Sequence, residues 1–243
     1  MSNLSIMYSG GLDSFIMYHY ALKEGYDPTC LHVDLGHPYG EKERRTFNMG
    51  GWFPEVDIID MSSLYNLIEK RLSNQIIPSR NVLLGVIGSM FSERVWLGAL
   101  DGEQLGKEHD KSPRFFEELT QLLSYTNEFF QPSTIVEAPF ANMSKSETIE
   151  WAINRGIPLE TLFETSTCYH PTIDKCGECL TCVKRWMSFK ANGIDEPGYA
   201  SNPLESKYMK ELVIEIPKAL KDEDYSRFTV KRCLEFLKVM NEI

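Results

Sequence analysis

The chain has 243 residues and a formal net charge of −10, with 42% hydrophobic and 25% charged residues. This length is enough for one α/β domain with a small appendage, and the composition is that of a globular protein. The acidic balance argues against a broad phosphate-binding surface, so duplex nucleic acid is not an expected partner. We see no apolar run that could span a bilayer and no signal peptide, so we expect a cytoplasmic protein without a membrane partner.

Short apolar runs alternate with helix-like stretches along the first two thirds of the chain. The runs that predict strands lie at 4–9, 29–35, 55–61, 95–100 and 134–140. The stretches that predict helices lie at 15–26, 41–52, 81–95, 115–129 and 145–156. This alternation is typical of βαβ units and predicts an α/β fold with a doubly wound, mostly parallel sheet.

Two of the helix predictions carry further detail. Ser144 and Glu147 form an S-x-x-E capping box before the helix at 145–156, and Gly156 and Pro158 end it. In the stretch at 115–129 the apolar side chains have helical spacing, so we expect them in the core. They are Phe115, Phe116, Leu119, Leu122, Leu123 and Phe129.

The last third of the chain changes in character. Residues 1–165 are expected to form the ATP-binding domain, 166–195 a small cysteine-containing segment, and 196–243 a C-terminal helical extension. Pro, Gly, Ser and Asn in 196–203 predict a linker at the start of this extension. An apolar stripe near the end predicts a helix that packs on the main domain or forms a dimer contact. It comprises Val230, Cys233, Leu234, Leu237 and Met240.

The hexapeptide SGGLDS lies directly between the first predicted strand and the first predicted helix. Gly10 and Gly11 let the main chain approach an oxygen-rich ligand, and the helix N-terminus favours anions. Ser9, Ser14 and Asp13 add hydroxyl donors and a carboxylate for a cation. The sequence therefore predicts a phosphate cradle that matches neither the Walker nor the dinucleotide glycine motif. A tight glycine turn with a capped helix is the structural alternative.

Four cysteines follow one another closely in the sequence STCYHPTIDKCGECLTC. Their C-x7-C-x2-C-x2-C spacing can surround one tetrahedral zinc ion, and an all-sulfur shell predicts a structural metal. We expect Lys175, Lys184 and Arg185 to ease the negative charge of the thiolates. Two disulfides or an iron–sulfur cluster are the alternatives. The predicted ligands are Cys168, Cys176, Cys179 and Cys182.

The loop and the cysteine cluster together resemble one family. SGG-x-DS is similar to the pyrophosphatase-type loop of adenylate-forming ATP enzymes, in which ATP is split between its α and β phosphates. With the cysteine cluster, IPSRN at 77–81, WLGALD at 96–101 and APFANMSKSETI at 138–149, the chain resembles the 7-cyano-7-deazaguanine synthase family of queuosine-type deazapurine biosynthesis. The resemblance covers approximately residues 4–197.

The resemblance implies an ATP-dependent ligase that adenylates a 7-carboxy-7-deazaguanine-like carboxylate. Ammonia then gives the amide, and a second adenylation gives the nitrile. ATP, Mg²⁺ and a structural Zn²⁺ are the implied cofactors, and the family commonly forms homodimers.

The motifs also imply roles for individual residues. Asp13, Arg80 and Lys145 are predicted catalytic residues, where Lys145 is a cation at a helix N-terminus and so indicates a bound anion. The predicted ATP-binding set is Ser9, Gly10, Gly11, Leu12, Asp13, Ser14, Val33, Asp34, Arg80 and Asn81. The predicted substrate-binding set is Asp101, Asp110, Lys111 and Arg114.

Two departures from the family pattern leave the substrate and the nucleophile open. Lys111 and Ser112 replace an expected Cys–Arg pair, and Thr167 stands where an aromatic residue is usual. A close alternative therefore transfers the activated deazaguanine to an amine on a partner protein, as relatives in antiviral gene clusters are thought to do. More distant alternatives are a tRNA-modifying sulfurtransferase, which the acidic charge disfavours, and a zinc-stabilised binding module without activity.

Overall fold

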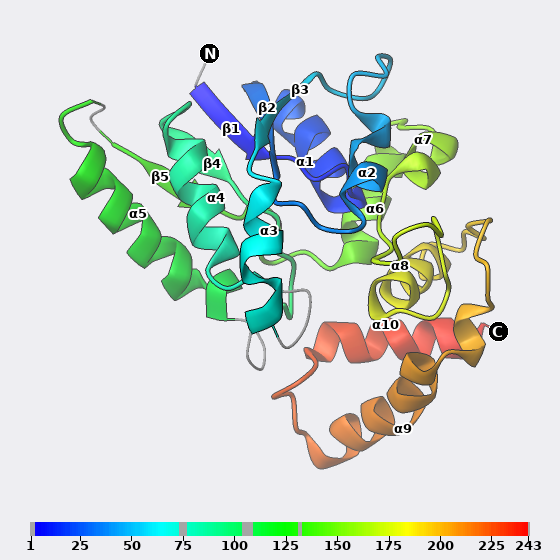
Figure 1. Ribbon diagram of the computed structural model, residues 1–243. Helices are drawn as coiled ribbons and strands as arrows, with labels where there is room; N and C mark the ends of the chain where they lie inside the picture. Colours follow the sequence, from blue (N-terminus) through cyan, green and yellow to red (C-terminus); the bar gives the residue numbers. More distant parts are fainter. Residues whose placement is uncertain (1–2, 73–76, 104–108, 131–132, 243) are drawn as a thin grey trace.

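A five-stranded parallel sheet organises the protein (Figure 1). The computed structural model describes residues 3–72, 77–103, 109–130 and 133–242. The strand order is β3-β2-β1-β4-β5, and every neighbouring pair is parallel. The strands are β1 (Asn3–Met7), β2 (Asp27–Asp34), β3 (Val56–Asp60), β4 (Arg94–Trp96) and β5 (Ile135–Glu137).

Helices cover both faces of the sheet, which confirms the predicted α/β class (Figure 1). One face carries α1 (Leu12–Lys23), α6 (Lys145–Asn154) and α7 (Leu159–Glu164). The other carries α3 (Ser63–Ile68), α4 (Arg80–Ser89) and α5 (Pro113–Asn127). The cores on the two faces come from alternate strand residues: Leu4 and Ile6 point to the first core and Met7 to the second.

The strand order reverses direction between β1 and β4, the two central strands. The chain leaves β1 toward β2 on one side and later enters β4 on the other side. In open parallel sheets, ligands bind outside the carboxyl ends of the strands at such a switch point. The loop at residues 8–11 and the loop at 97–103 follow these two strands. The fold therefore places the predicted phosphate cradle at the expected position for a ligand.

Three further helices complete the chain: α8 (Leu180–Lys190), α9 (Lys207–Asp222) and α10 (Val230–Asn241). Their facing side chains form a third hydrophobic core, to which Trp186, Ile216 and Phe236 belong. Helix α8 also packs against α6, so the C-terminal helices lie beside the first turn of α6. Among the described residues, we find no helix that is long and apolar enough to cross a membrane.

Two helix predictions are wrong in detail. The stretch at 41–52 holds only the single-turn helix α2 (Gly40–Glu43), followed by a 3₁₀ turn at Arg44–Thr46. In α10 the buried face is formed by Cys233, Phe236 and Val239, and Leu237 and Met240 of the predicted stripe pack against the same core. Val230 and Leu234 of that stripe are exposed, because α8 and α9 contact only one face of α10.

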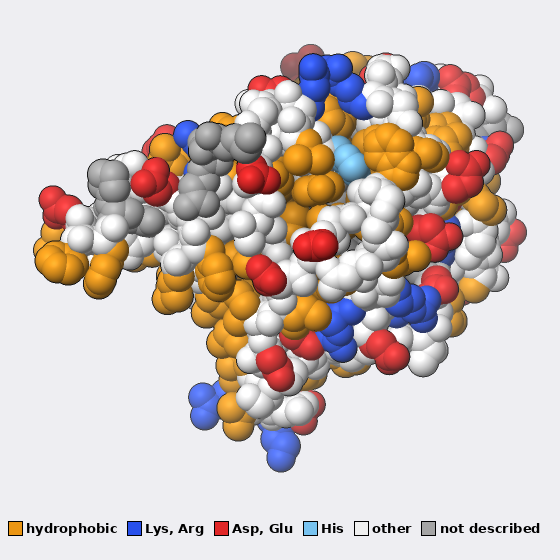
Figure 2. Space-filling view, turned by 90° about the horizontal axis from the view of Figure 1, so that it is seen from above, with side chains coloured by type: hydrophobic (Ala, Val, Ile, Leu, Met, Phe, Trp, Pro, Cys, Tyr) orange, Lys and Arg blue, Asp and Glu red, His pale blue; other side chains and the backbone are white. Residues whose placement is uncertain are grey.

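The aromatic residues at the end of α5 are not in the core. Phe116, Leu119 and Leu123 are buried as predicted, but Leu122 is 53% exposed and Phe129 is 91% exposed. Helix α5 lies over β5 at the edge of the sheet, so one flank of the helix has no layer to pack against. In Figure 2 hydrophobic side chains gather at the left side of the molecule, where α5 lies in Figure 1. The homodimer remains a prediction.

The segment at 196–203 is not a free linker, because it packs against the cysteine segment. Glu196 has a fully buried carboxylate that forms an ion pair with the equally buried Arg185 at 2.7 Å. The backbone N–H of Ser201 donates to the carbonyl of Cys176 at 3.1 Å. Gly177 has a φ of +80° and touches the Ser201 backbone so closely that no Cβ would fit. The division into three domains remains a prediction.

We expect the Arg185→Met substitution to destabilise the protein by about 3–5 kcal/mol, because it leaves the Glu196 carboxylate buried beside fewer partners. Arg185 also donates to the Thr165 and Leu162 carbonyls and to the Thr167 hydroxyl. Urea denaturation measures the loss. The double variant Arg185→Met/Glu196→Gln should recover part of it, and a loss below about 1 kcal/mol for the single variant would contradict this interpretation.

Candidate active site and metal centre

The loop between β1 and α1 is shaped by Gly10. This residue has a φ of +70°, and a Cβ at this position would lie 2.0 Å from the Glu43 carbonyl oxygen. The loop backbone can therefore pass α2 only with glycine here. Gly11 precedes α1, whose N-terminus has no side-chain cap. An uncapped helix N-terminus next to a glycine loop fits an anion, as the sequence predicts.

Two serine hydroxyls brace the loop. Ser14 Oγ donates to the Gly11 carbonyl at 3.0 Å and accepts from the Ser9 N–H at 3.2 Å. Ser9 Oγ accepts from the Gly11 N–H at 3.3 Å. The hydroxyls therefore hold the loop closed, while Leu12, the first residue of α1, anchors it in the core.

We expect Gly10→Ala to abolish ATP binding. The added Cβ would force the loop away from α2, and the left-handed conformation itself costs about 1–2 kcal/mol for an L-residue. Equilibrium binding of a fluorescent ATP analogue measures the effect. Gly25→Ala is the matched control, because Gly25 has a φ of +83° at the far end of α1 and nothing within 4 Å of its Cβ position. Equal ATP affinity in both variants would show that the loop shape does not matter.

The predicted catalytic residues Asp13 and Lys145 lie in contact, although they are far apart in the sequence. Lys145 Nζ lies 2.6 Å from Asp13 Oδ2 and contacts the other carboxylate oxygen as well. Asp13 belongs to the first turn of α1, and Lys145 is the first residue of α6. Their side chains are 32% and 18% exposed, so both remain accessible to a ligand. A cation at the start of a helix is unfavourable by itself, and here the Asp13 carboxylate offsets it.

The start of α6 is fixed by the predicted capping box. Ser144 Oγ accepts from the Glu147 N–H, and Glu147 accepts from the Ser144 N–H at 2.8 Å. Ser144 and Ser146 also donate their hydroxyls to Glu235 of α10. The last helix of the chain therefore holds the segment that presents Lys145.

Arg80 and Asn81 begin α4 at the same edge of the sheet. Ser79, the residue before them, has the left-handed φ of 57° that few non-glycine residues adopt. Asn81 is buried and donates from Nδ2 to the Asp110 carbonyl at 3.1 Å, which ties α4 to the predicted substrate segment. Among the described residues, the Arg80 guanidinium has no ion pair.

Val33 and Asp34 end β2 and lie beside the loop. Val33 is buried. Asp34 accepts a hydrogen bond from the Gly36 N–H at 3.0 Å and forms an ion pair with Arg44. These contacts give Asp34 a clear structural role, and its predicted part in ATP binding remains untested.

The predicted substrate residues separate into two groups. Lys111 Nζ lies 3.3 Å from the Glu103 carboxylate, and the neighbouring Asp110 accepts through its carbonyl from the Asn81 side chain. Burial has the largest single effect on Glu103 and opposes its ionisation, but the charges of Lys111, Lys145 and Lys184 together outweigh it, so the pKa of Glu103 is lowered. Lys107 and Glu108 of the same segment lie outside the described residues.

Of the other two predicted substrate residues, Asp101 lines a cavity together with Glu103 and Lys145, whereas Arg114 lies apart. Asp101 accepts from the Thr229 hydroxyl at 2.7 Å, at the start of α10. Arg114 is 84% exposed and pairs with Glu118 on the surface of α5. The structure therefore does not bring Arg114 to the other predicted residues, and its role is unsupported by its position.

A cavity of about 230 Å³ lies between the 100–103 loop, the start of α6 and the helices α8 to α10. Lys145 and Ser144 form one end of its wall. Apolar side chains such as Leu212, Ile216 and Phe228 alternate with charged ones. The carboxylates in the wall are Asp101, Glu103, Glu211, Glu215 and Glu235. The basic residues are Lys145, Lys184, Arg227 and Arg232.

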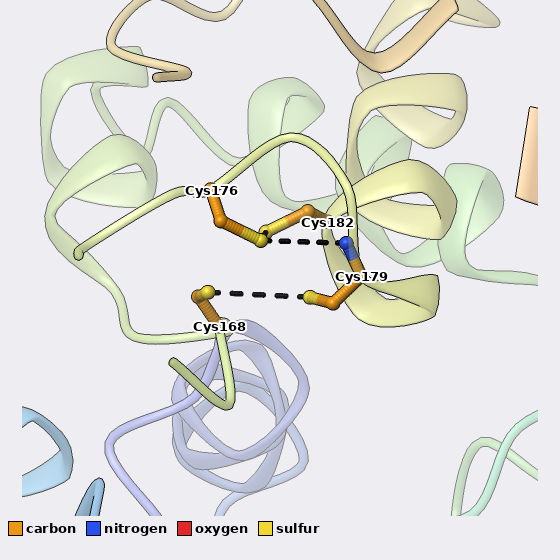
Figure 3. A group of neighbouring side chains, drawn as sticks. All are labelled: Cys168, Cys176, Cys179 and Cys182. Atoms are coloured by element: carbon orange, nitrogen blue, oxygen red, sulfur yellow. Dashed lines mark hydrogen bonds between the residues drawn. The ribbon is translucent and has the colours of Figure 1, made fainter. Parts of the chain in front are cut away.

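The four clustered cysteines converge on one point (Figure 3). Their sulfur atoms all lie within 4.8 Å of one another, with Cys176 and Cys182 3.9 Å apart and Cys168 and Cys179 4.0 Å apart. A disulfide needs about 2.05 Å, so the predicted alternative of two disulfides does not describe this arrangement. Sulfur atoms bound to one zinc at about 2.3 Å lie about 3.8 Å apart in a tetrahedron. The cluster can therefore hold a single metal ion and is consistent with zinc.

Backbone N–H groups support this arrangement. Cys176 Sγ accepts from the N–H groups of Glu178 and Cys179 at 3.4 and 3.3 Å, and Cys168 Sγ accepts from the His170 N–H at 3.3 Å. Such donors stabilise thiolates. The predicted role of Arg185 is different in the structure, because its guanidinium is engaged by the Glu196 carboxylate.

The cysteine segment is joined directly to the phosphate loop. The Ser166 N–H donates to the Gly10 carbonyl at 2.9 Å, two residues before Cys168. Lys42 is buried and donates to the carbonyls of Cys168 and Ile173, both at 2.8 Å. A metal in the cluster would therefore position the loop as well as close the cysteine segment.

Sequence reasoning missed three residues near Arg80: Tyr39, Glu43 and Tyr169. The rings of Tyr39 and Tyr169 lie 5.2 Å apart. Burial, more than the opposing charge of Arg80, raises the pKa of Glu43 to about 7. The position of Tyr169 directly after Cys168, one of the four clustered cysteines, was the available signal. Nothing in the pattern EKER around Glu43 marks it out.

Comparison with known proteins agrees with these features. The family model described as "Queuosine biosynthesis protein QueC" matches residues 54–193, more than half of the chain. The chain belongs to the QueC family. A relative named "7-cyano-7-deazaguanine synthase 2" in Colwellia psychrerythraea is 30% identical over 81% of this chain and 98% of its own length. The 7-cyano-7-deazaguanine synthase of Psychromonas ingrahamii is 26% identical over 79% of this chain and 95% of its own.

The QueC family model covers only part of the candidate site. Arg80, Lys145 and the four cysteines lie inside it, whereas α9 and α10 lie after residue 193. Among solved structures, a predicted subunit of a tRNA methyltransferase from Methanocaldococcus jannaschii is similar to this QueC-family chain at a TM-score of 0.44. It is 13% identical and covers 63% of this chain and 75% of its own.

Proposed function

We propose that this protein uses ATP to adenylate the carboxylate of a 7-carboxy-7-deazaguanine-like base and converts it with ammonia, through the amide, to the nitrile. The observation that carries the proposal is the contact of Asp13 with Lys145 beside the glycine loop, at the switch point of the sheet. Family membership and relatives named 7-cyano-7-deazaguanine synthase support the choice of substrate.

The chemistry requires activation because a carboxylate is a poor electrophile. Its oxygen attacks the α-phosphorus of ATP, pyrophosphate leaves, and an acyl adenylate forms. Ammonia attacks the carbonyl carbon, AMP leaves with the oxygen, and one proton is released with the amide. The amide oxygen then attacks a second ATP, and loss of AMP and a proton gives the nitrile. Two ATP molecules are consumed for each nitrile.

The residues of this chain position the reactants and neutralise charge. The loop backbone at Gly10 and Gly11 and the N-terminus of α1 would hold the departing pyrophosphate. Lys145 and Arg80 would stabilise the negative charge that develops where the carboxylate meets the α-phosphate. Charge stabilisation and positioning are the main requirements of nucleotidyl transfer, for which no covalent enzyme intermediate is needed.

The proposed metal ions have separate roles. We propose the Asp13 carboxylate, which Lys145 contacts in this structure, as a ligand of a magnesium ion, which would supply further charge neutralisation on the phosphates when bound. Zinc in the cysteine cluster would be structural, because four thiolates leave no position for a reacting water.

The test is a reaction with 7-carboxy-7-deazaguanine, ATP, Mg²⁺ and ammonia, with products separated by mass spectrometry. We expect the free nitrile, with two AMP molecules for each nitrile formed. A product that stops at the adenylate or the amide would overturn the nitrile step, and ATP cleavage that does not require the deazapurine would overturn the substrate.

The cavity beside Lys145 favours a second candidate function, in which an amine on a partner protein replaces ammonia. Half of the residues in its wall lie after residue 193, in α9, in α10 and between them, outside the QueC match. Ammonia needs no cavity with apolar sides, whereas an amine on a peptide brings apolar neighbours and a positive charge that carboxylates would attract. If this second function is correct, the reaction with ammonia should give little nitrile, and the reaction with the partner protein should give a deazaguanine adduct on that protein.

A further inference from the structure

Glu43 presents an unused carboxylate at the edge of the candidate site. It lies in α2, and its backbone carbonyl faces Gly10 of the phosphate loop. Among the described residues, its carboxylate has no hydrogen bond or ion pair. Burial acts on it most strongly, followed by the charge of Arg80 and then that of Asp34. Glu43 is half-buried, so its unpaired carboxylate is accessible to a ligand.

Aromatic side chains lie next to this carboxylate. The rings of His37 and Tyr39 stack at 4.9 Å with an interplanar angle of 11°, and the ring of Tyr169 lies 5.2 Å from that of Tyr39, tilted by 38°. Both His37 ring nitrogens are buried without a hydrogen-bond partner among the described residues. Tyr39 and Tyr169 each interact electrostatically with both Glu43 and Arg80, which places all four in one neighbourhood. Flat rings of this kind bind the faces of bases.

The charges here have an order that matches a guanine-type base. Such a base has two adjacent donors, N1–H and the 2-amino group, at one end of its polar edge, followed by the O6 acceptor. A carboxylate accepts from both donors at once, and a guanidinium donates to acceptors. Adenine has the opposite arrangement, with an acceptor at N1 and a donor at its 6-amino group. A 7-carboxylate lies near O6, on the side that would face Arg80.

We propose that Glu43 is the specificity residue that binds the N1–H and 2-amino donors of the deazaguanine substrate, with the exposed ring of Tyr169 as the stacking surface and the buried Tyr39 ring supporting it. This inference rests on the proposed function for the identity of the base. It assigns the aromatic contact to Tyr169, which directly follows Cys168. Thr167, which directly precedes Cys168, stands where an aromatic residue is usual in the family. Arg80 then faces the carboxylate that is to be activated.

The test is equilibrium binding of 7-deazaguanine and 7-deazahypoxanthine, which lacks the 2-amino group, by isothermal calorimetry without ATP. We expect the wild type to prefer 7-deazaguanine by about 10-fold or more. Glu43→Gln should bind 7-deazaguanine about 10- to 100-fold more weakly and lose this preference. Glu41→Gln is the matched control, because Glu41 is exposed on the same short helix and should keep the preference.

Tyr169 is tested in the same way. Tyr169→Leu should weaken the binding of both bases by about 5- to 100-fold. Tyr169→Phe should keep the wild-type affinity, because the ring and not the hydroxyl stacks on the base. Zinc content and ATP affinity show that each variant is folded. An unchanged ratio of the two affinities in Glu43→Gln would overturn the assignment of Glu43. Base binding that depends on Glu43 without any ATP cleavage would instead overturn the proposed function alone.

Binding should also depend on pH, because only the ionised carboxylate accepts from both donors. Glu43 has a pKa of about 7 in the free protein, so the affinity for 7-deazaguanine should fall as the pH drops below 7, by up to about tenfold per unit. Glu43→Gln should remove this dependence, and a wild-type affinity that is flat from pH 5.5 to 7.5 would contradict it. The groups that face Glu43 are Arg80 of α4, Asp34 of β2, Arg44 of the 3₁₀ turn, Lys42 of α2, Tyr39 and Tyr169.

Discussion

Lys145→Met is expected to lower carboxylate-dependent pyrophosphate release by about 10²–10³-fold or more while leaving the protein at least as stable. The loss follows from the proposed role of Lys145 at the reacting phosphate, where removal of one stabilising group costs this much. The Asp13–Lys145 ion pair is partly exposed, and such pairs contribute about 0–1 kcal/mol. Removal of a cation from the start of α6 also relieves an unfavourable interaction with the helix dipole.

A coupled assay for pyrophosphate and a urea denaturation curve measure the two effects. Lys23→Met is the matched control. Lys23 belongs to the same helix as Asp13, but it is exposed in the last turn of α1, at the end far from the loop. It should keep full activity. If the Lys145→Met enzyme keeps more than about a tenth of the activity, the loss is far smaller than the one expected for a charge-stabilising group, and the catalytic role is ruled out.

Removal of the metal from the cysteine cluster should be the most destabilising change in this chain. Structural zinc contributes about 10–16 kcal/mol in zinc-finger peptides, comparable to the whole stability of a domain. Cys176→Ala should therefore lose the metal and lower the Tm by about 10 °C or more. Because Ser166 and Lys42 join this segment to the loop and to α2, ATP affinity should fall as well.

Elemental analysis and thermal melting measure both outcomes. Cys233→Ala is the matched control, since Cys233 is equally buried but lies in the third core, and it should cost only about 1 kcal/mol and keep the metal. One zinc per chain is expected. Iron with acid-labile sulfide, or a Cys176→Ala protein as stable as Cys233→Ala, would contradict a structural zinc site.

Local patterns in the sequence predicted much of this architecture. The alternation of apolar runs gave the parallel sheet, because buried strands are short and apolar on both faces. The Ser144–Glu147 capping box and the convergence of the four cysteines were predicted from spacings of a few residues. These features depend on neighbours in the sequence, so they can be read without the fold.

The remaining features depend on contacts between distant segments. Glu43 is placed by the close approach of α2 to Gly10 and has no local signal. Tyr169 is placed by the pairing of Ser166 with the same loop, and its only local signal is its position directly after Cys168. Helical periodicity marked Leu122 and Phe129 as core, but it cannot show that α5 covers only the edge of the sheet. The linker prediction failed because Glu196 has a buried partner, Arg185 of α8, that the local sequence does not reveal.

The measurement that tests the central claim most directly follows an oxygen atom. 7-Carboxy-7-deazaguanine labelled with ¹⁸O in both carboxylate oxygens is incubated with the protein, ATP, Mg²⁺ and ammonia, and the nucleotide products are analysed by mass spectrometry. Adenylation of the carboxylate predicts AMP and pyrophosphate, with one ¹⁸O in the AMP released at the amide step. ADP and labelled inorganic phosphate, or AMP that carries no label, would contradict it.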